Sequence, residues 1–249
     1  MKTKRILFLS FLLATGTLAN AQQITIMPKL GTDIYYMTTP KSVQGMSQKP
    51  AAGFTGGAAI DIKIHKWFSI QTEFLYITKG YSSTYTFTDS SGNKNGSQTD
   101  KYTFSYIQIP ILAKANYSKG NFKMYATGGA SFDYGIGGSC KISQSGYSLS
   151  GIPSSGKTYF ENYPSSYTAN GFIQYFTKSS FNRSDISLQF GGGIGYKVGI
   201  GTITFDARYG LGLINFYKKA VDNYYQSTDL TSKYRMLSLT VGYAIPLGK

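Results

Sequence analysis

The chain has 249 residues and a formal net charge of +14, and it contains 22 Tyr, 16 Phe and 29 Gly but only one Trp, one His and one Cys. The single Cys excludes an internal disulfide, and the single His excludes a His-rich metal site. After the first 21 residues, no stretch approaches the ~18–20 apolar residues of a membrane-spanning helix. The length and composition therefore favour one β domain.

The first 21 residues have the pattern of a secretory signal peptide. A basic start precedes an apolar run over residues 6–13, and Ala19-Asn20-Ala21 forms a small-residue cleavage site. The apolar run is too short to span a bilayer, and no Cys follows the cleavage site to carry a lipid anchor. We predict that residues 1–21 are removed and that residues 22–249 form a single β-barrel domain.

The rest of the chain alternates between strand-like segments and connections of two lengths. Short connections at 65–66, 116–120 and 199–200 alternate with long ones at 37–51, 81–101, 140–184 and 218–233. Since alternate connections of an antiparallel sheet lie at opposite ends, all long loops share one end and all short turns the other. Bacterial outer-membrane barrels have this asymmetry, with short periplasmic turns and long external loops. The eight predicted strands are 23–36, 52–64, 67–80, 102–115, 121–139, 185–198, 201–217 and 234–247.

Apolar and polar side chains alternate along these segments, as they do on a strand with two different faces. In residues 106–114, Ile107, Ile109 and Ile111 share one face, while Gln108 and Lys114 lie on the other. A soluble sandwich buries its apolar face in a core, whereas a membrane barrel turns that face to lipid. The signal peptide and the loop asymmetry favour the second arrangement. We predict an all-β fold, a single closed antiparallel transmembrane β-barrel of eight strands in the bacterial outer membrane.

Charged residues on the polar faces of the predicted strands point into the lumen. Eight strands enclose an interior just wide enough for side chains to fill, and an unpaired buried charge is costly. The charges are therefore expected to form a structural ion-pair plug or, alternatively, to line a narrow polar path. Arg208 should be central, with Asp206 on its own strand and Glu73 and Asp61 as candidate partners. The predicted lumen charge network consists of Lys29, Asp33, Asp61, Lys63, Glu73, Lys114, Asp133, Lys197, Asp206 and Arg208.

The third long loop is rich in aromatic residues separated by Ser, Gly and Asn. Such sequences make adaptable contact surfaces, but they also let a long loop pack on itself, so both interpretations stand. Positive charge near the loops suits the phosphates of lipopolysaccharide. No base-reading module indicates nucleic-acid binding. The candidate recognition residues are Tyr159, Phe160, Tyr163, Tyr167, Phe172, Tyr175 and Phe176.

Three motifs suggest ligand sites but lack the necessary context. Residues 151–158 match the phosphate-loop pattern, which requires a strand before the glycines and a helix after them. Residues 89–96 offer oxygen atoms without the bidentate acid of a calcium loop and fit a turn. The glycines of 191–195 lie within a strand, where they relieve crowding or ease curvature. We therefore expect no cofactor, no metal ion and no enzyme activity, with His65 in a surface turn.

Two stretches resemble signature strands of the PorT-like outer-membrane β-barrel family of Bacteroidetes. The first stretch is Glu73-Phe74-Leu75-Tyr76 followed by Lys79-Gly80, and the second is residues 106–114. Residues 206–213 and 239–243 are similar to the last two strands of that family. Gln108 stands where the family usually has an acidic residue. The resemblance implies a porin-like barrel in the outer membrane, and one family member is tied to type IX secretion.

Two functional classes follow from these observations. The first is a non-enzymatic barrel that acts as a scaffold, a secretion accessory or a surface binding protein through its external loops. Its expected partners are outer-membrane lipid, lipopolysaccharide and a protein partner at the external loops or periplasmic turns. The alternative is a small passive pore for small polar solutes, and a conducting lumen would distinguish it from the first class.

Overall fold

The computed structural model describes residues 23–38, 46–88, 90–146, 154–160, 166–168, 171–175, 182–216 and 231–247. The predicted signal peptide lies outside these residues. Within the described part of the chain, no helix has the length and apolarity needed to cross a membrane.

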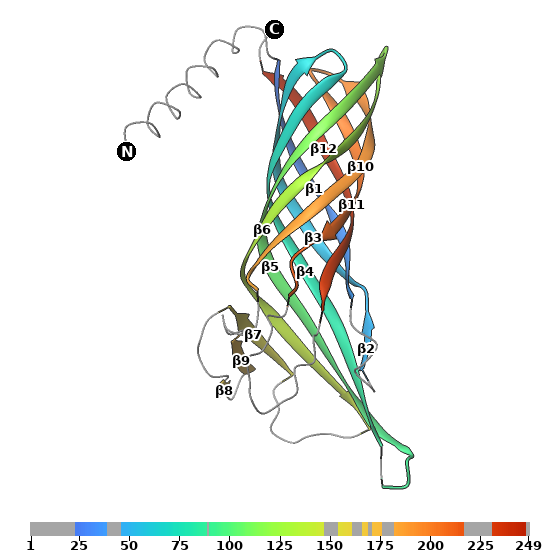
Figure 1. The fold of residues 1–249 in the computed structure, drawn as a ribbon, viewed down its shortest axis with the longest axis vertical. Helices are drawn as coiled ribbons and strands as arrows, with labels where there is room; N and C mark the ends of the chain where they lie inside the picture. The colour runs from blue at the N-terminus through green and yellow to red at the C-terminus, as the bar shows by residue number, and fades with distance from the viewer. Residues whose placement is uncertain are drawn as a thin grey trace, which may run out of the picture.

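Eight antiparallel strands form a closed ring. Strands that follow one another along the ring are paired, and the pairs β1–β12 and β6–β10 complete the closure. The prediction of an eight-stranded antiparallel barrel is therefore confirmed (Figure 1). The ring strands are β1 (Ile24–Thr38), β3 (Ala51–His65), β4 (Phe68–Thr88), β5 (Lys94–Lys119), β6 (Phe122–Ser145), β10 (Ser184–Val198), β11 (Gly201–Gly212) and β12 (Lys233–Leu247).

The two ends of the barrel differ in their connections. At one end, here called the turn end, the strands are joined by tight turns at 66–67, 120–121 and 199–200. Gly120 and Gly199 have φ values of +61° and +59° in these turns, a conformation that glycine adopts without steric cost. The opposite end, here called the loop end, carries the longer connections, whereas the first residue of β1 and the last residue of β12, Ile24 and Leu247, are paired at the turn end (Figure 1). This arrangement follows the predicted alternation of long and short connections.

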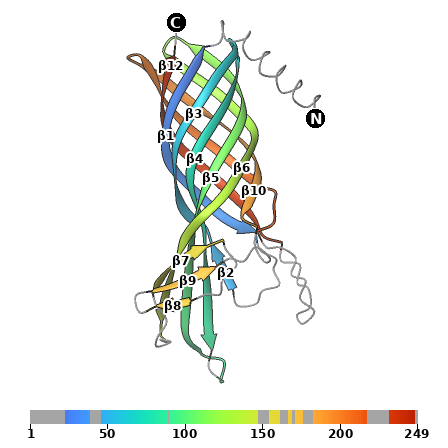
Figure 2. The same ribbon diagram turned by 90° about the vertical axis from the view of Figure 1, so that its left-hand side faces the viewer.

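Strands β4, β5 and β6 continue beyond the ring at the loop end as a β4–β6 extension, defined as residues 81–88, 94–105 and 137–145 (Figure 2). The prediction that 81–101 is a loop was therefore wrong, as was the loop assignment of 140–145. The Ser, Gly and Asn residues of 90–97 are typical of loops, but Thr84–Phe87 consists of β-branched and aromatic residues that favour strands. The β4–β5 ladder runs unbroken from Tyr81–Tyr102 to Phe87–Gly96.

Four short strands lie at the loop end. Strand β2 (Met46–Lys49) pairs with β4, and β7 (Ser155–Tyr159) pairs with β6. Strand β9 (Gly171–Tyr175) runs parallel to β7, and β8 (Ser166–Thr168) pairs with β9. The extension is therefore widened into a small sheet outside the barrel.

The outer surface of the ring has an apolar band between two aromatic belts. From Trp67 in the turn before β4 to Tyr76 on β4, the belts are separated by nine residue steps. At ~3.3 Å per residue and a tilt of about 40°, this spacing gives roughly 23 Å, close to the ~25 Å apolar band of outer-membrane barrels. The turn-end belt includes Trp67, Tyr117, Phe122 and Tyr196, the loop-side belt includes Tyr36, Tyr76, Tyr134 and Tyr209, and the band includes Leu30, Ile70, Phe74, Ile111, Ile203 and Val241.

Candidate functional site

The lumen is filled with charged and polar side chains from all eight strands. The alternation that turns Ile70 and Phe74 outward turns Gln71 and Glu73 inward, where they are 1% and 2% exposed. The six acidic residues that the structure describes in the ring all lie on the inner face: Asp33, Asp61, Glu73, Asp133, Asp185 and Asp206.

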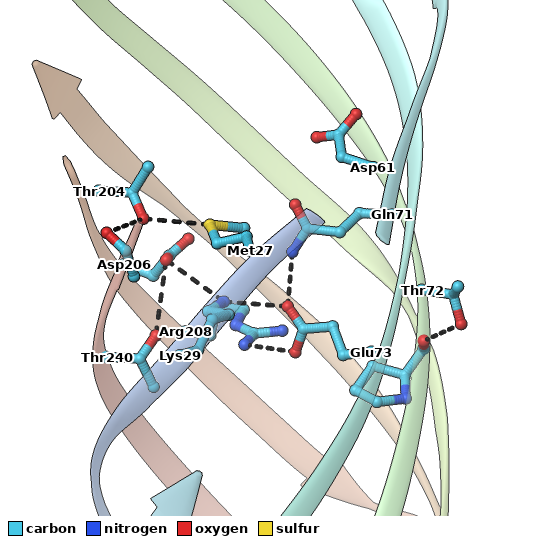
Figure 3. A network of polar contacts seen from close by, with 12 residues as sticks. Met27, Lys29, Asp61, Gln71, Thr72, Glu73, Thr204, Asp206, Arg208 and Thr240 are labelled. Carbon is cyan, nitrogen blue, oxygen red and sulfur yellow. Dashed lines mark hydrogen bonds and ion pairs between the residues drawn. The ribbon is translucent and has the colours of Figure 1, made fainter. Parts of the chain in front are cut away.

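Four charged residues from β1, β4 and β11 meet near the middle of the barrel and define the central ion-pair layer (Figure 3). The Nζ atom of Lys29 lies 2.9 Å from Glu73 Oε1 and 3.3 Å from Asp206 Oδ2. The Nη2 atom of Arg208 lies 2.8 Å from Glu73 Oε2. Two cations therefore balance two carboxylates, as burial in a low-dielectric interior requires.

Neighbouring side chains support this layer. The Tyr125 hydroxyl donates a hydrogen bond of 2.8 Å to Asp206, and Gln71 donates one to Glu73. Gly193 lies opposite both Tyr125 and Asp206 in the strand register. A Cβ atom at Gly193 would lie 2.5 Å from the Tyr125 hydroxyl oxygen, so glycine gives the tyrosine room to reach Asp206.

A second ion pair lies nearer the turn end. Lys114 Nζ is 2.9 Å from Asp61 Oδ2, donates a hydrogen bond of 2.9 Å to Gln71 and sits 4.1 Å from the centre of the Tyr125 ring. The expectation that Asp61 binds Arg208 was therefore wrong. Asp61 is opposite Gln71 in the β3–β4 register, two residues closer to the turn end than Ala59, which faces Glu73.

A third group of charges, the loop-side ion-pair cluster, consists of Lys79, Asp133 and Asp185. The Nζ atom of Lys79 is 2.5 Å from Asp133 and 3.3 Å from Asp185. The predicted network did not include Lys79 or Asp185. The alternation of the sequence does place Lys79 in the lumen, because it lies an even number of residues from Glu73 and therefore on the same face of the strand. Asp185 is the first residue of a predicted strand, where alternation defines the face less well.

An aromatic cap covers the loop-side cluster. Phe104 packs against Phe160 and Phe216 with ring centroids 5.6 and 5.7 Å apart, and Tyr106 meets Phe160 at 6.0 Å. Phe160 is 3% exposed, so its predicted role as a surface recognition residue is contradicted. The physical reason is that Phe160 directly follows β7, which pairs with β6 and brings the ring over the barrel mouth, where burial of apolar area is favourable.

The remaining predicted residues lie in different settings. Lys63 and Lys197 are on the inner face but exposed, and Asp33 is buried and accepts a hydrogen bond from Tyr35. Tyr159 is half-buried in β7, whereas Tyr167, Phe172 and Tyr175 fall in β8 and β9. Tyr163 and Phe176 lie outside the described residues, as do Asp89 and residues 151–153 of the phosphate-loop match.

The structural context of the motifs differs from that of ligand sites. Gly156, Lys157 and Thr158 lie in strand β7, so no helix begins at this lysine. His65 is the last residue of β3, exposed, with its ring 5.3 Å from that of Trp67. Among the described residues, no three His, Cys, Asp or Glu side chains are grouped in a way that could hold a metal ion.

Two buried ionisable groups lie in the β4–β6 extension, beyond the ring. Burial raises the pKa of Asp100, and a hydrogen bond of 2.9 Å from Gln98 partly offsets this effect. Burial also raises the pKa of the Cys140 thiol to about 11. The thiolate is the reactive form of cysteine, so Cys140 is protonated and unreactive at neutral pH.

The ring, its lipid-facing band and its charged lumen agree with the comparison to known families. Residues 20–218 match a family model described as the outer membrane protein beta-barrel domain. The chain belongs to this outer-membrane β-barrel family. The protein is therefore an integral protein of the outer membrane, as predicted.

The search of curated proteins found no match. Several solved outer-membrane proteins are distantly similar to this protein. Neisserial surface protein A is 14% identical, with a TM-score of 0.42 over 89% of this chain and 96% of the other. OprG from Pseudomonas aeruginosa is 7% identical, with a TM-score of 0.42 over 91% and 97%. Ail from Yersinia pestis is 14% identical, with a TM-score of 0.38 over 90% and 99%.

The orientation of the barrel can be tested by cysteine labelling. If the short turns are periplasmic, a bulky membrane-impermeant maleimide should label Ser154→Cys on intact cells and should label Ser118→Cys only after the outer membrane is permeabilised. Both positions are exposed, and the buried native Cys140 should give little background. Labelling of Ser118→Cys together with no labelling of Ser154→Cys on intact cells would reverse the orientation.

Proposed function

We propose that this protein is a non-conducting, non-enzymatic outer-membrane barrel that acts as a scaffold, secretion accessory or surface binding protein through its loop end. The observation that carries the proposal is the filling of the lumen. The central ion-pair layer, the loop-side ion-pair cluster and the aromatic cap lie one above another along the barrel. The space left among Lys79, Asp133, Asp185 and Tyr234 is about 10 Å³, the minimum that a single water molecule requires.

The β4–β6 extension supports a binding role because it offers a rigid surface beyond the membrane. Tyr85 and Phe87 are 38% and 37% exposed on it. Paired strands hold such side chains at fixed positions, which lowers the entropy lost when a partner binds. The resemblance to the PorT-like family is the reason that a secretion accessory role is included in the proposal.

A basic face on the extension supports contact with lipopolysaccharide. Lys101 is opposite Lys141 in the β5–β6 register, Lys157 is opposite Ser139 in the β6–β7 register, and all three lysines are exposed. Like charges directly opposite each other on a sheet are destabilising. Asp100, the one acidic residue described in the extension, is buried on the other face. Phosphate groups of lipopolysaccharide would compensate these charges.

A passive pore is the alternative, and conductance measurements separate the two functions. Purified protein in a planar bilayer is expected to show little steady ion current, because the ion pairs and the aromatic cap formed by the described residues occupy the lumen and leave only about 10 Å³ beside the loop-side ion-pair cluster. An open porin reconstituted from the same detergent provides the positive control. Large, long-lived open channels from this protein would contradict the proposal and favour the pore.

A further inference from the structure

A polar cavity opens in the lumen at the turn end, on the far side of the central ion-pair layer from the aromatic cap. Its volume is about 130 Å³, roughly ten times the space that one water molecule requires. Lys66 and Ser118 of the turn end line it on one side, and Lys114, Tyr125 and Thr204 line it on the side of the central ion-pair layer.

Lysines dominate the charge of this cavity. Lys63 from β3, Lys66 from the 66–67 turn and Lys123 from β6 line it together with the paired Lys114 and Asp61. Lys197 shares the inner face opposite Thr202 and lies within electrostatic range of Lys123. In the part of the chain that the structure describes, no carboxylate forms an ion pair with Lys63, Lys66, Lys123 or Lys197.

The cavity also presents neutral hydrogen-bonding groups. Ser69, Thr202 and Thr204 are 1%, 4% and 4% exposed, and Asn116 and Ser118 complete this side of the pocket. The amine of Lys123 already donates a hydrogen bond of 3.0 Å to Thr202. Charged and neutral polar groups from several strands therefore line one cavity that opens at the turn end.

We propose that the turn-end cavity binds a phosphoryl anion. A cleft with low-dielectric walls and an excess of one charge concentrates ions of the opposite charge. Lysine ammonium groups bind phosphate as point charges. The hydroxyl groups of Ser69 and Thr202 accept hydrogen bonds from Asn116 and Lys123, so their own protons can be donated to the other oxygens of a tetrahedral anion. A dianion would also relieve the repulsion among the lysines, whereas the Asp61 carboxylate is already satisfied by Lys114.

Calorimetric titration with inorganic phosphate tests this proposal. The protein is held in a zwitterionic detergent at neutral pH and constant ionic strength, and wild type is expected to give a saturable heat. Lys63→Gln combined with Lys123→Gln should weaken phosphate binding at least tenfold. Because this variant removes repulsion, it should fold as well as wild type, which the gel mobility of unheated samples checks.

The matched control removes two positive charges away from the cavity. Lys119 lies at the same end on the outer face, and Lys94 lies in the extension. Lys94→Gln combined with Lys119→Gln should bind phosphate as wild type does. Absence of saturable binding by wild type, or an equal loss in both double variants, would overturn the proposal.

A second arm distinguishes a soluble phosphate compound from a lipid headgroup. Wild type is reconstituted in phosphatidylcholine vesicles or in an equal mixture with phosphatidylglycerol, and the phosphate titration is repeated. Binding that persists in the mixed vesicles supports a soluble ligand. Binding that is lost only in the mixed vesicles supports a headgroup that occupies the same cavity.

Discussion

Arg208→Ala is expected to lower the free energy of unfolding by about 3–5 kcal/mol, the usual cost of removing one partner from a buried ion pair. The variant leaves Glu73 and Asp206 with Lys29 as the only cation in the central ion-pair layer. The guanidinium is 3% exposed and Glu73 is fully buried, so water cannot replace the missing charge.

A double variant tests whether charge imbalance causes the loss. Adding Glu73→Ala to Arg208→Ala restores neutrality, since Lys29 and Asp206 remain 3.3 Å apart. The double variant should therefore be more stable than Arg208→Ala alone, although it lacks more side-chain atoms. Coupling of this kind is expected only for residues that interact.

Urea unfolding in lipid vesicles provides the measurement, with the fluorescence of the single Trp67 as the probe. Trp67 is 57% exposed at the turn-end belt, so unfolding moves it from lipid to water. Arg235→Ala is the matched control, because Arg235 is half-buried and bonds only to backbone carbonyls among the described contacts. A midpoint for Arg208→Ala equal to that of wild type would show that the lumen does not depend on this arginine.

The sequence was sufficient to predict the barrel because its strands repeat one simple pattern. Residues two apart share a face, so the outward Ile109 and Ile111 and the inward Gln108 and Lys114 follow from the spacing alone. The alternation of short and long connections predicted which end of the barrel carries the turns and which carries the loops. These signals are local in the chain, and they do not require knowledge of which side chains meet across the lumen.

The charge partners could not be predicted in the same way. Alternation gives the face of each residue, but the depth in the barrel depends on register between strands. Asp61 and Glu73 both point inward, yet Asp61 faces Gln71 and meets Lys114, whereas Glu73 meets Lys29 and Arg208. A difference of two residues in depth along the β3–β4 ladder separates the two carboxylates and decides which cation each one meets.

The loop end was the least predictable part for a related reason. Residues 90–97 have the composition of a loop, but pairing with neighbouring strands holds residues 94–97 in β structure and leaves only the turn at 90–93. Pairing depends on context more than on the propensity of single residues. Likewise, the burial of Phe160 depends on the β6–β7 pairing that places it over the barrel mouth.

Lys79→Met should produce a loss of about 3–5 kcal/mol, because the lysine is the shared cation of Asp133 and Asp185. Its side chain is 3% exposed, and the two carboxylates are 1% and 8% exposed, so solvent screens their repulsion poorly. The lysine also lies 4.8 Å from the Tyr106 ring centre and 5.1 Å from that of Tyr234, and these cation–π contacts would be lost as well.

Neutralising the carboxylates should reverse most of this loss. The triple variant Lys79→Met, Asp133→Asn, Asp185→Asn keeps the volume of the loop-side ion-pair cluster and removes all three charges. Replacing a buried set of ion pairs by neutral groups of similar shape costs far less free energy than removing one of its charges alone. Lys119→Met serves as the control, since Lys119 is exposed on the outer face and its replacement should change stability by no more than about 0.5 kcal/mol. The same urea titration reads all three proteins. If the triple variant is as unstable as Lys79→Met, the lysine acts through packing of its methylenes against Tyr106 and Tyr234, and charge balance does not govern this level of the lumen.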